Sequence, residues 1–184
     1  MSRSWGRLVL LLAFLGAGCS REEGLEPAGV AVQRPDRVVQ DFELTETHDG
    51  VLEWTLRADE ARTFRNAGET RLSGVRMQFV RADGSVRSRL IADNGTIKDK
   101  TGDMHATGNV VLVSAEGDRL TTDDLWYEKG KSIIRGPGPV RIEKPDRVLT
   151  GTGFRAKPDL SEYEVNEDVH IELVDRDGSI ELDR

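Results

Sequence analysis

Cysteine is almost absent from this sequence, which contains Cys19 and no second one. A lone cysteine excludes an internal disulfide, so no disulfide framework supports the fold. Aromatic residues make up only 5% of the chain, and all hydrophobic residues together reach 37%. This composition is lean for a thick and completely filled hydrophobic core.

The signatures of common enzyme mechanisms are missing as well. The sequence has neither G-x-S-x-G nor H-E-x-x-H. The histidines, His48, His105 and His170, lack the spacing of metal ligands. Asp123 and Asp124 are adjacent, and neighbouring strand residues point to opposite faces, so the pair cannot flank one bond. The sequence therefore predicts no catalytic residues and no metal site.

One hydrophobic run stands near the N-terminus, after Arg3 and Arg7. Residues 8–18 are uncharged and mostly apolar, too short for a membrane-spanning helix and typical of a secretory signal. The run ends in L-G-A-G-C, which resembles a bacterial lipobox with Gly16 in place of the usual leucine. We therefore predict a lipid on Cys19. An ordinary cleavage site and an uncleaved short anchor are the alternatives.

Composition divides the chain into a signal or anchor segment at 1–18, a lipidated terminus and tether at 19–36, and a folded domain at 37–184. The formal net charge is −7, and an acidic chain repels phosphate backbones, so nucleic acid is excluded as a partner. The charge is uneven. Residues 57–89 carry eight Arg against four acids, whereas residues 158–184 carry ten acids against two Arg.

Two sets of residues repeat along the domain at almost the same interval. The first set is Val75, Val110, Val140 and Val169, and the second is Leu56, Leu90, Leu120 and Leu149. The spacings are 35, 30 and 29 in the valine set and 34, 30 and 29 in the leucine set. Turn sequences rich in Gly, Asn and Pro recur with them, at 66–69, 82–85, 100–103, 115–118, 128–131, 144–147, 157–160 and 175–178. The chain therefore contains four units of about 30 residues.

Hydrophobic and polar residues alternate within each unit. Val75, Met77 and Phe79, for example, are separated by Arg76 and Gln78. This period of two is typical of strands that bury one face and expose the other. One unit cannot hide its apolar face alone, so the units must stack. The pattern predicts an all-β sandwich or solenoid, whose interior either closes or leaves a slot along one side.

Residues 106–156 resemble the LptC family of lipopolysaccharide-export proteins, which is related to OstA/LptA-type domains. The matching elements are G-N-V followed by an alternating strand, L-T-T-D-D-L-W-Y at 120–127, G-P-V-R-I-E at 138–143 and L-T-G-T-G-F at 149–154. Residues 41–61 resemble the family's opening, and the likeness spans about 37–175. It implies an incomplete β-jellyroll, in which two facing, mostly antiparallel sheets hold a lipid-accepting groove.

The resemblance also implies partners and a location. The family takes lipopolysaccharide from inner-membrane ABC transporter subunits of the LptF/LptG kind and passes it to an LptA-like periplasmic protein by edge-strand pairing. It needs no cofactor and performs no bond chemistry. We expect an anchor at the periplasmic face of the inner membrane. Ser20 instead favours the outer membrane under enteric sorting habits.

The inward side chains are the expected lining of the groove for lipid A acyl chains. They are Phe42, Leu44, Trp54, Leu56, Met77, Phe79, Leu112, Tyr127, Val140, Ile142, Val169 and Ile171. Of the adjacent Trp126 and Tyr127 only one can face inward, and Tyr127 matches Ile97 in the repeat. Two alternatives remain open. One is a scaffold lipoprotein in which these residues form ordinary core, and the other is a polysaccharide-acting β-helix enzyme.

Overall fold

A computed structural model of the chain describes residues 33–174 and 180–181. The strands are β1 (Arg37–His48), β2 (Val51–Phe64), β3 (Glu69–Val80), β4 (Val86–Lys98), β5 (Met104–Ser114), β6 (Arg119–Glu128), β7 (Ile133–Lys144), β8 (Arg147–Ala156), β9 (Tyr163–Val174) and β10 (Ile180–Glu181). Two short 3₁₀ turns, η1 (Arg65–Ala67) and η2 (Lys129–Lys131), connect β2 to β3 and β6 to β7. The expected signal, Cys19, most of the tether and the turn at 175–178 lie outside the described residues.

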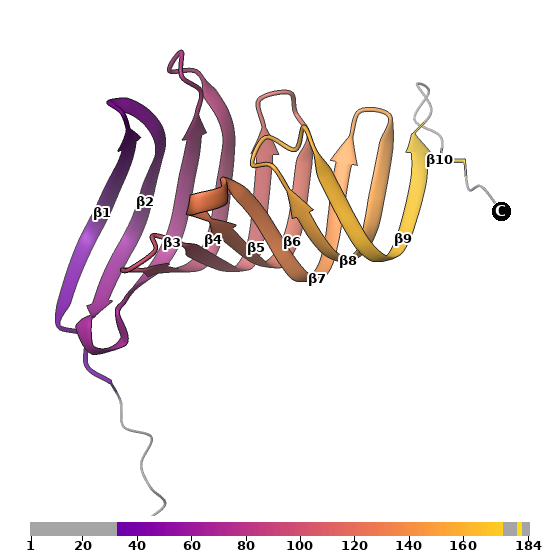
Figure 1. Cartoon of the computed structure of the whole chain (residues 1–184). Helices are drawn as coiled ribbons and strands as arrows, with labels where there is room; N and C mark the ends of the chain where they lie inside the picture. Colours follow the sequence, from indigo (N-terminus) through magenta and orange to yellow (C-terminus); the bar gives the residue numbers. More distant parts are fainter. Residues whose placement is uncertain (1–32, 175–179, 182–184) are drawn as a thin grey trace, which may run out of the picture. The chain divides into compact units, whose positions relative to one another are not determined.

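All strands belong to one antiparallel sheet, in which each strand pairs with the next along the chain (Figure 1). Short connections between consecutive strands favour this arrangement, because an antiparallel neighbour is the only one a tight turn can reach. The prediction of an all-β protein is confirmed, and every predicted turn from 66–69 to 157–160 lies at a strand junction. The two facing sheets that the resemblance implies are not confirmed, because one hydrogen-bonded ladder runs from β1 to β10.

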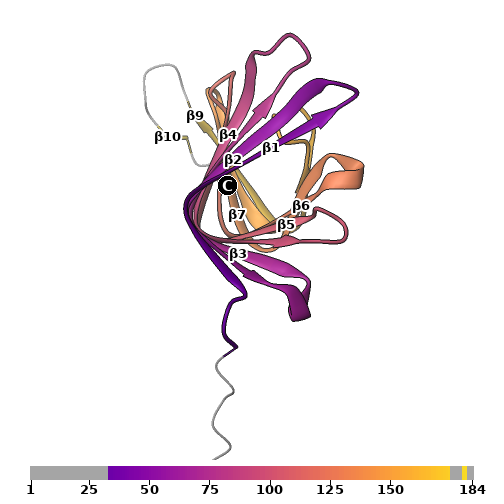
Figure 2. The same cartoon turned by 90° about the vertical axis from the view of Figure 1, so that its left-hand side faces the viewer.

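Most strands bend near their middle, so this one sheet forms two walls that diverge from a common line of bends (Figure 2). The pairing register shifts at the bends, as between Ile91 and Asn94 in the β4–β5 pair and between Thr107 and Val110 in the β5–β6 pair. We call the wall that ends in the β1–β2 and β3–β4 turns the upper wall, and the wall that ends in η1 and η2 the lower wall.

Glycines paired with carboxylates form several of these bends. Gly74 in β3 and Gly108 in β5 have φ of +64° and +76°, a region that favours glycine because it has no Cβ. A Cβ on Gly108 would lie 2.8 Å from Oδ2 of Asp93 in β4, and a Cβ on Gly74 would overlap the carboxylate of Asp59. The extra residue at such a bulge turns the strand, and this explains why the alternation of the sequence breaks at these points.

One inward row of apolar residues crosses the upper wall, with one residue from each of β1 to β9. In order the members are Leu44, Leu56, Met77, Leu90, Leu112, Leu120, Ile142, Leu149 and Ile171, each paired with the next across the sheet. We call it the central row. It contains the whole leucine set of the repeat, so the repeat interval reflects the register of the ladder. Residues from Leu56 to Leu149 are buried, and together with lower-wall residues such as Tyr127 and Ile134 they form the core.

The bend in β7 generates a test of packing between neighbouring strands. A Cβ on Gly136 would overlap the backbone oxygen of Asp124 and the ring of Phe154. We expect Gly136→Ala to lower the free energy of unfolding by about 1–3 kcal/mol, as overpacked substitutions do. Gly138 lies two residues away with nothing within 4 Å of its Cβ position, so Gly138→Ala is the matched control and should change stability by less than about 0.5 kcal/mol. Urea unfolding of both variants measures the difference, and equal losses would contradict the close packing at Gly136.

Candidate functional site: the interior between the two walls

The predicted groove residues lie on the inner face of the sheet, but they differ in burial. The buried ones are Trp54, Leu56, Met77, Phe79, Leu112, Tyr127, Val140 and Ile142. Phe42 and Leu44 in β1 are partly buried and pack against this cluster. As its match with Ile97 in the repeat predicts, Tyr127 is the buried member of the pair, and Trp126 lies outside, where its ring stacks on His105 with centroids 3.9 Å apart.

Val169 and Ile171 have a different environment from the rest of the predicted lining. Their exposed fractions are 45% and 56%, and that of Leu173 in the same strand is 60%. Among the described residues, β10 pairs only with Leu173 and Val174 of β9, so most of β9 has β8 as its only strand partner. The end of the central row is therefore exposed at a sheet edge that also leaves backbone groups without a ladder partner.

The space between the walls is narrow in the middle and wider at its open side. An apolar cavity bounded by β2 to β6, which includes Met77, Leu90 and Leu125, encloses only about 20 Å³, close to the minimum for one water. A second cavity, of about 360 Å³, lies at the open side, and we call it the mouth cavity. Its lining combines apolar residues, such as Leu52 and Phe79, with polar ones, such as Glu53 and Arg87.

Contacts between the walls cross the open side near the mouth cavity. Phe79 of the upper wall and Tyr127 of the lower wall meet edge to face, with ring centroids 5.1 Å apart. Burial raises the pKa of Tyr127, so its hydroxyl stays neutral and adds no charge to this apolar contact. Lys129 Nζ in η2 donates to Glu46 Oε1 in β1 at 2.6 Å. These contacts set how far the two walls stand apart.

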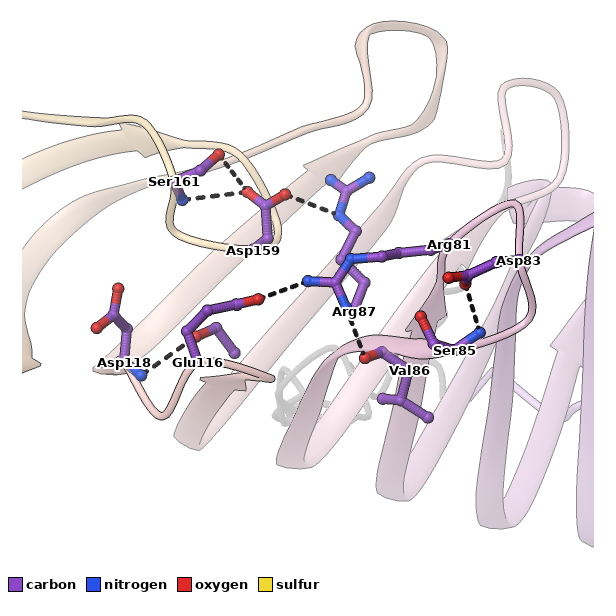
Figure 3. Close-up of polar contacts among 10 residues, drawn as sticks. Arg81, Asp83, Ser85, Val86, Arg87, Glu116, Asp118, Asp159 and Ser161 are labelled. Carbon is purple, nitrogen blue, oxygen red and sulfur yellow. Dashed lines mark hydrogen bonds and ion pairs between the residues drawn. The ribbon is translucent and has the colours of Figure 1, made fainter.

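The loop between β8 and β9 (residues 157–162) also crosses the open side, from the lower wall to the upper wall. Pro158 and Leu160 are fully buried, and Leu160 belongs to the core cluster. Between them, Asp159 Oδ2 lies 3.3 Å from Arg87 Nε at the start of β4 (Figure 3). Asp159 Oδ1 accepts from the backbone N and the Oγ of Ser161, at 3.1 and 2.6 Å.

The charge state of Asp159 follows from these contacts. Burial raises its pKa, but the hydrogen bonds from Ser161 and the charge of Arg87 outweigh burial and hold the pKa below the ordinary value. The carboxylate is therefore ionised at neutral pH and available to Arg87. The sequence predicted the turn at 157–160 but did not predict that Leu160 belongs to the core. A single leucine in a turn is not part of an alternating pattern, so the pattern could not identify it as buried.

The polar side chains on the outer faces of the walls are candidates for catalytic or metal-binding groups. His105 Nε2 and Asp124 Oδ2 are 2.8 Å apart, whereas Asp123 is exposed on the neighbouring position. Within residues 33–174, no group of three or more His, Cys, Asp and Glu side chains is placed to hold a metal ion. The described residues contain no helix that is long and apolar enough to span a membrane.

Known proteins share this fold. The crystal structure of LptH from Pseudomonas aeruginosa, described as the LptA homologous periplasmic component of the conserved lipopolysaccharide transport device, is similar to this chain with a TM-score of 0.51. The sequences are 10% identical, and the match covers 64% of this chain and 92% of that one. The likeness defines the class of the fold, an LptA-like open β-structure. A search of curated proteins found no match.

The sequence itself assigns the family within this class. The model of the family described as "Lipopolysaccharide-assembly, LptC-related" matches residues 7–174. The chain belongs to the LptC family, as the motifs at 106–156 indicate. Membership supports a role in lipopolysaccharide transport.

The central row offers a direct test of which inner residues are core. Leu112 is completely buried and Ile171 is 56% exposed, although both belong to the same row. Leu112→Ala should lower the free energy of unfolding by about 2–5 kcal/mol, because it leaves a cavity. Ile171→Ala should lower it by less than about 0.5 kcal/mol in the isolated protein. Urea titration distinguishes the two, and a large loss for Ile171→Ala would mean that β9 is covered in solution.

Proposed function

We propose that this protein is a non-catalytic relay for lipopolysaccharide, which holds lipid A acyl chains between its two walls during export. The observation that carries the proposal is an apolar interior that reaches solvent through a cavity of about 360 Å³ on one side. Each CH₂ group of an acyl chain costs about 0.8 kcal/mol in water. An interior with an open side shields the acyl chain from water and still allows the lipid to leave for the next protein.

Placement in the export pathway is part of the same proposal. The LptC family acts on the periplasmic side of the inner membrane, and a lipid on Cys19 or an uncleaved anchor would hold this chain there. Subunits similar to LptF and LptG would supply the lipopolysaccharide. An LptA-like protein would receive it by adding a strand to the exposed edge of β9, a common mode of peptide and domain recognition.

A second function, that of a structural scaffold, is favoured by one observation. The cavity between β2 and β6 encloses only about 20 Å³, so in this conformation the middle of the interior has no room for an acyl chain. A relay therefore requires the walls or a covering loop to move, whereas a scaffold requires no movement. The β-helix enzyme has no such support, since the fold is one antiparallel up-and-down sheet.

Photocrosslinking at Phe79 tests lipid binding. Phe79 is inward and lines the mouth cavity, whereas Gln78 is the exposed outward neighbour on the same strand. A photoreactive residue at position 79 should label purified lipopolysaccharide about tenfold more than one at position 78, because only position 79 meets the acyl chains. Ile142 and Arg141 form a second matched pair. Ile142 is buried deeper in the interior, and Arg141 is its exposed outward neighbour on the same strand. Equal labelling at 79 and 78 would refute the relay and favour the scaffold.

Substitution at the edge strand tests the transfer partner. Burial of Ile171 against an added LptA-like domain is worth about 1.5–3 kcal/mol, so Ile171→Asp should raise the Kd for that domain by about tenfold or more. Val51 at the start of β2 has a similar exposed fraction, 43%, and Val51→Asp is the control. An equal effect of both variants in a titration would argue against docking at β9.

The acidic residues of β9 predict that the Kd measured in the same titration depends on salt. Glu164, Glu167, Asp168 and Glu172 lie on this strand, and we propose that they face a basic edge on the partner. Raising salt from about 50 to about 500 mM should then weaken binding several-fold through screening. A Kd that does not change with salt would contradict this part of the proposal.

A further inference from the structure

The β8–β9 loop is unusual among the connections of this fold because it fills the interior with its own side chains. Apart from the buried Asp118 in the β5–β6 turn, the other connections between the described strands, for example at Asp49–Gly50 and at Ala82–Ser85, are exposed or partly exposed turns. In the β8–β9 loop, Pro158 and Leu160 are fully buried, and Asp159 between them contacts Arg87 on the opposite wall. In Figures 1 and 2 the loop folds back over the open side of the sheet.

The loop borders the mouth cavity. Pro158 and Arg87 line the mouth cavity, together with residues of the β1–β2 and β3–β4 turns. The last members of the central row, from Ile142 to the exposed Ile171 on β9, do not line this cavity. An acyl chain in the mouth cavity therefore contacts Pro158 of the loop and none of these row members.

The polar contact between the loop and the opposite wall is weak. Arg87 Nε and Asp159 Oδ2 form an ion pair at 3.3 Å without the geometry of a hydrogen bond. Both side chains are largely buried, with 26% and 23% of their surface exposed, so the cost of removing the two charges from water offsets much of their attraction. Leu160 has φ of +57°, a conformation that residues other than glycine rarely adopt. Burial of its side chain offsets this strain while the loop is seated.

We propose that the β8–β9 loop is a displaceable plug, in which Pro158 and Leu160 occupy the position of a lipid acyl chain and the Arg87–Asp159 ion pair is the latch. The plug rests on the proposed function and goes beyond it, because it names which part of the interior must open. A hydrocarbon chain replaces the buried surface of Leu160 with its own, so the exchange leaves the apolar interior covered. With the loop seated, lipid is restricted to the mouth cavity. With the loop released, the path along the central row to β9 is open.

Two substitutions separate the latch from the plug. Asp159→Asn keeps an oxygen that can accept from Ser161 and removes the charge that faces Arg87. Leu160→Ala removes most of the buried plug. Glu162→Gln is the matched control, because it removes the same charge from the same loop, and among the described residues the Glu162 side chain forms its ion pair with the exposed Lys157. Each substitution is made in full-length protein that carries a photoreactive residue at position 79 or at position 142, and thermal unfolding verifies that each variant is folded.

The readout is the ratio of lipopolysaccharide labelling at position 142 to labelling at position 79. Asp159→Asn should raise this ratio about two- to fivefold, the range expected for loss of one partly exposed ion pair. Leu160→Ala should raise it further, and Glu162→Gln should leave it unchanged. An unchanged ratio in both Asp159→Asn and Leu160→Ala, with strong labelling at position 79, would overturn the plug and leave the relay intact. Absence of labelling at both positions in every variant would overturn the relay and the plug together.

Hydrogen exchange gives an independent measurement of the loop. The amide of Leu160 donates to the carbonyl oxygen of Lys157, and the amide of Lys157 donates to that of Glu162. Addition of lipopolysaccharide should speed exchange of both amides in the unsubstituted protein. Faster exchange supports release of the loop, and unchanged or slower exchange contradicts it.

Discussion

The register of one antiparallel ladder is the constraint on which this structure depends. The central row brings one apolar side chain from each of β1 to β9 to the same level, and a shift of one residue in any of these strands would turn its inner residues to solvent. Because the interior is built from pairs across strands, every strand contributes to a continuous apolar surface. That surface, with its exposed end at β9, is the feature that makes lipid transport physically reasonable for an LptC-family protein.

The bends turn this ladder into a two-walled interior. A flat sheet with the same register would have one apolar face open to water along its whole length. The bulges at Gly74 and Gly108, each beside an aspartate of the preceding strand, fold the sheet so that its inner face covers itself. Contacts such as Phe79–Tyr127 and Lys129–Glu46 then fix the separation of the walls. The β8–β9 loop fills what the walls leave uncovered.

The sequence could predict the parts of this structure that have a local period. Alternation identified the strands, Gly and Pro identified the turns, and the repeat interval matched the ladder register. It could not predict that the strands are long and bent, because the residues at Gly74 and Gly108 resemble ordinary strand interruptions. Nor could it predict that Val169 and Ile171 are exposed, since the alternation is the same in a covered strand and in an edge strand. The pairing of Arg87 with Asp159 depends on tertiary folding and leaves no signal at either position.

The acidic edge has a consequence for copies of this chain. If two molecules met through β9 in an antiparallel pair, the carboxylates of Glu164, Glu167, Asp168 and Glu172 on one would oppose those on the other. Like charges across a strand pair destabilise it, so self-association through this edge carries an electrostatic penalty, while a neutral or basic strand carries none. Negative charge on the β9 edge therefore disfavours pairing with a second copy of this chain. It leaves the edge open to a neutral or basic strand from another protein.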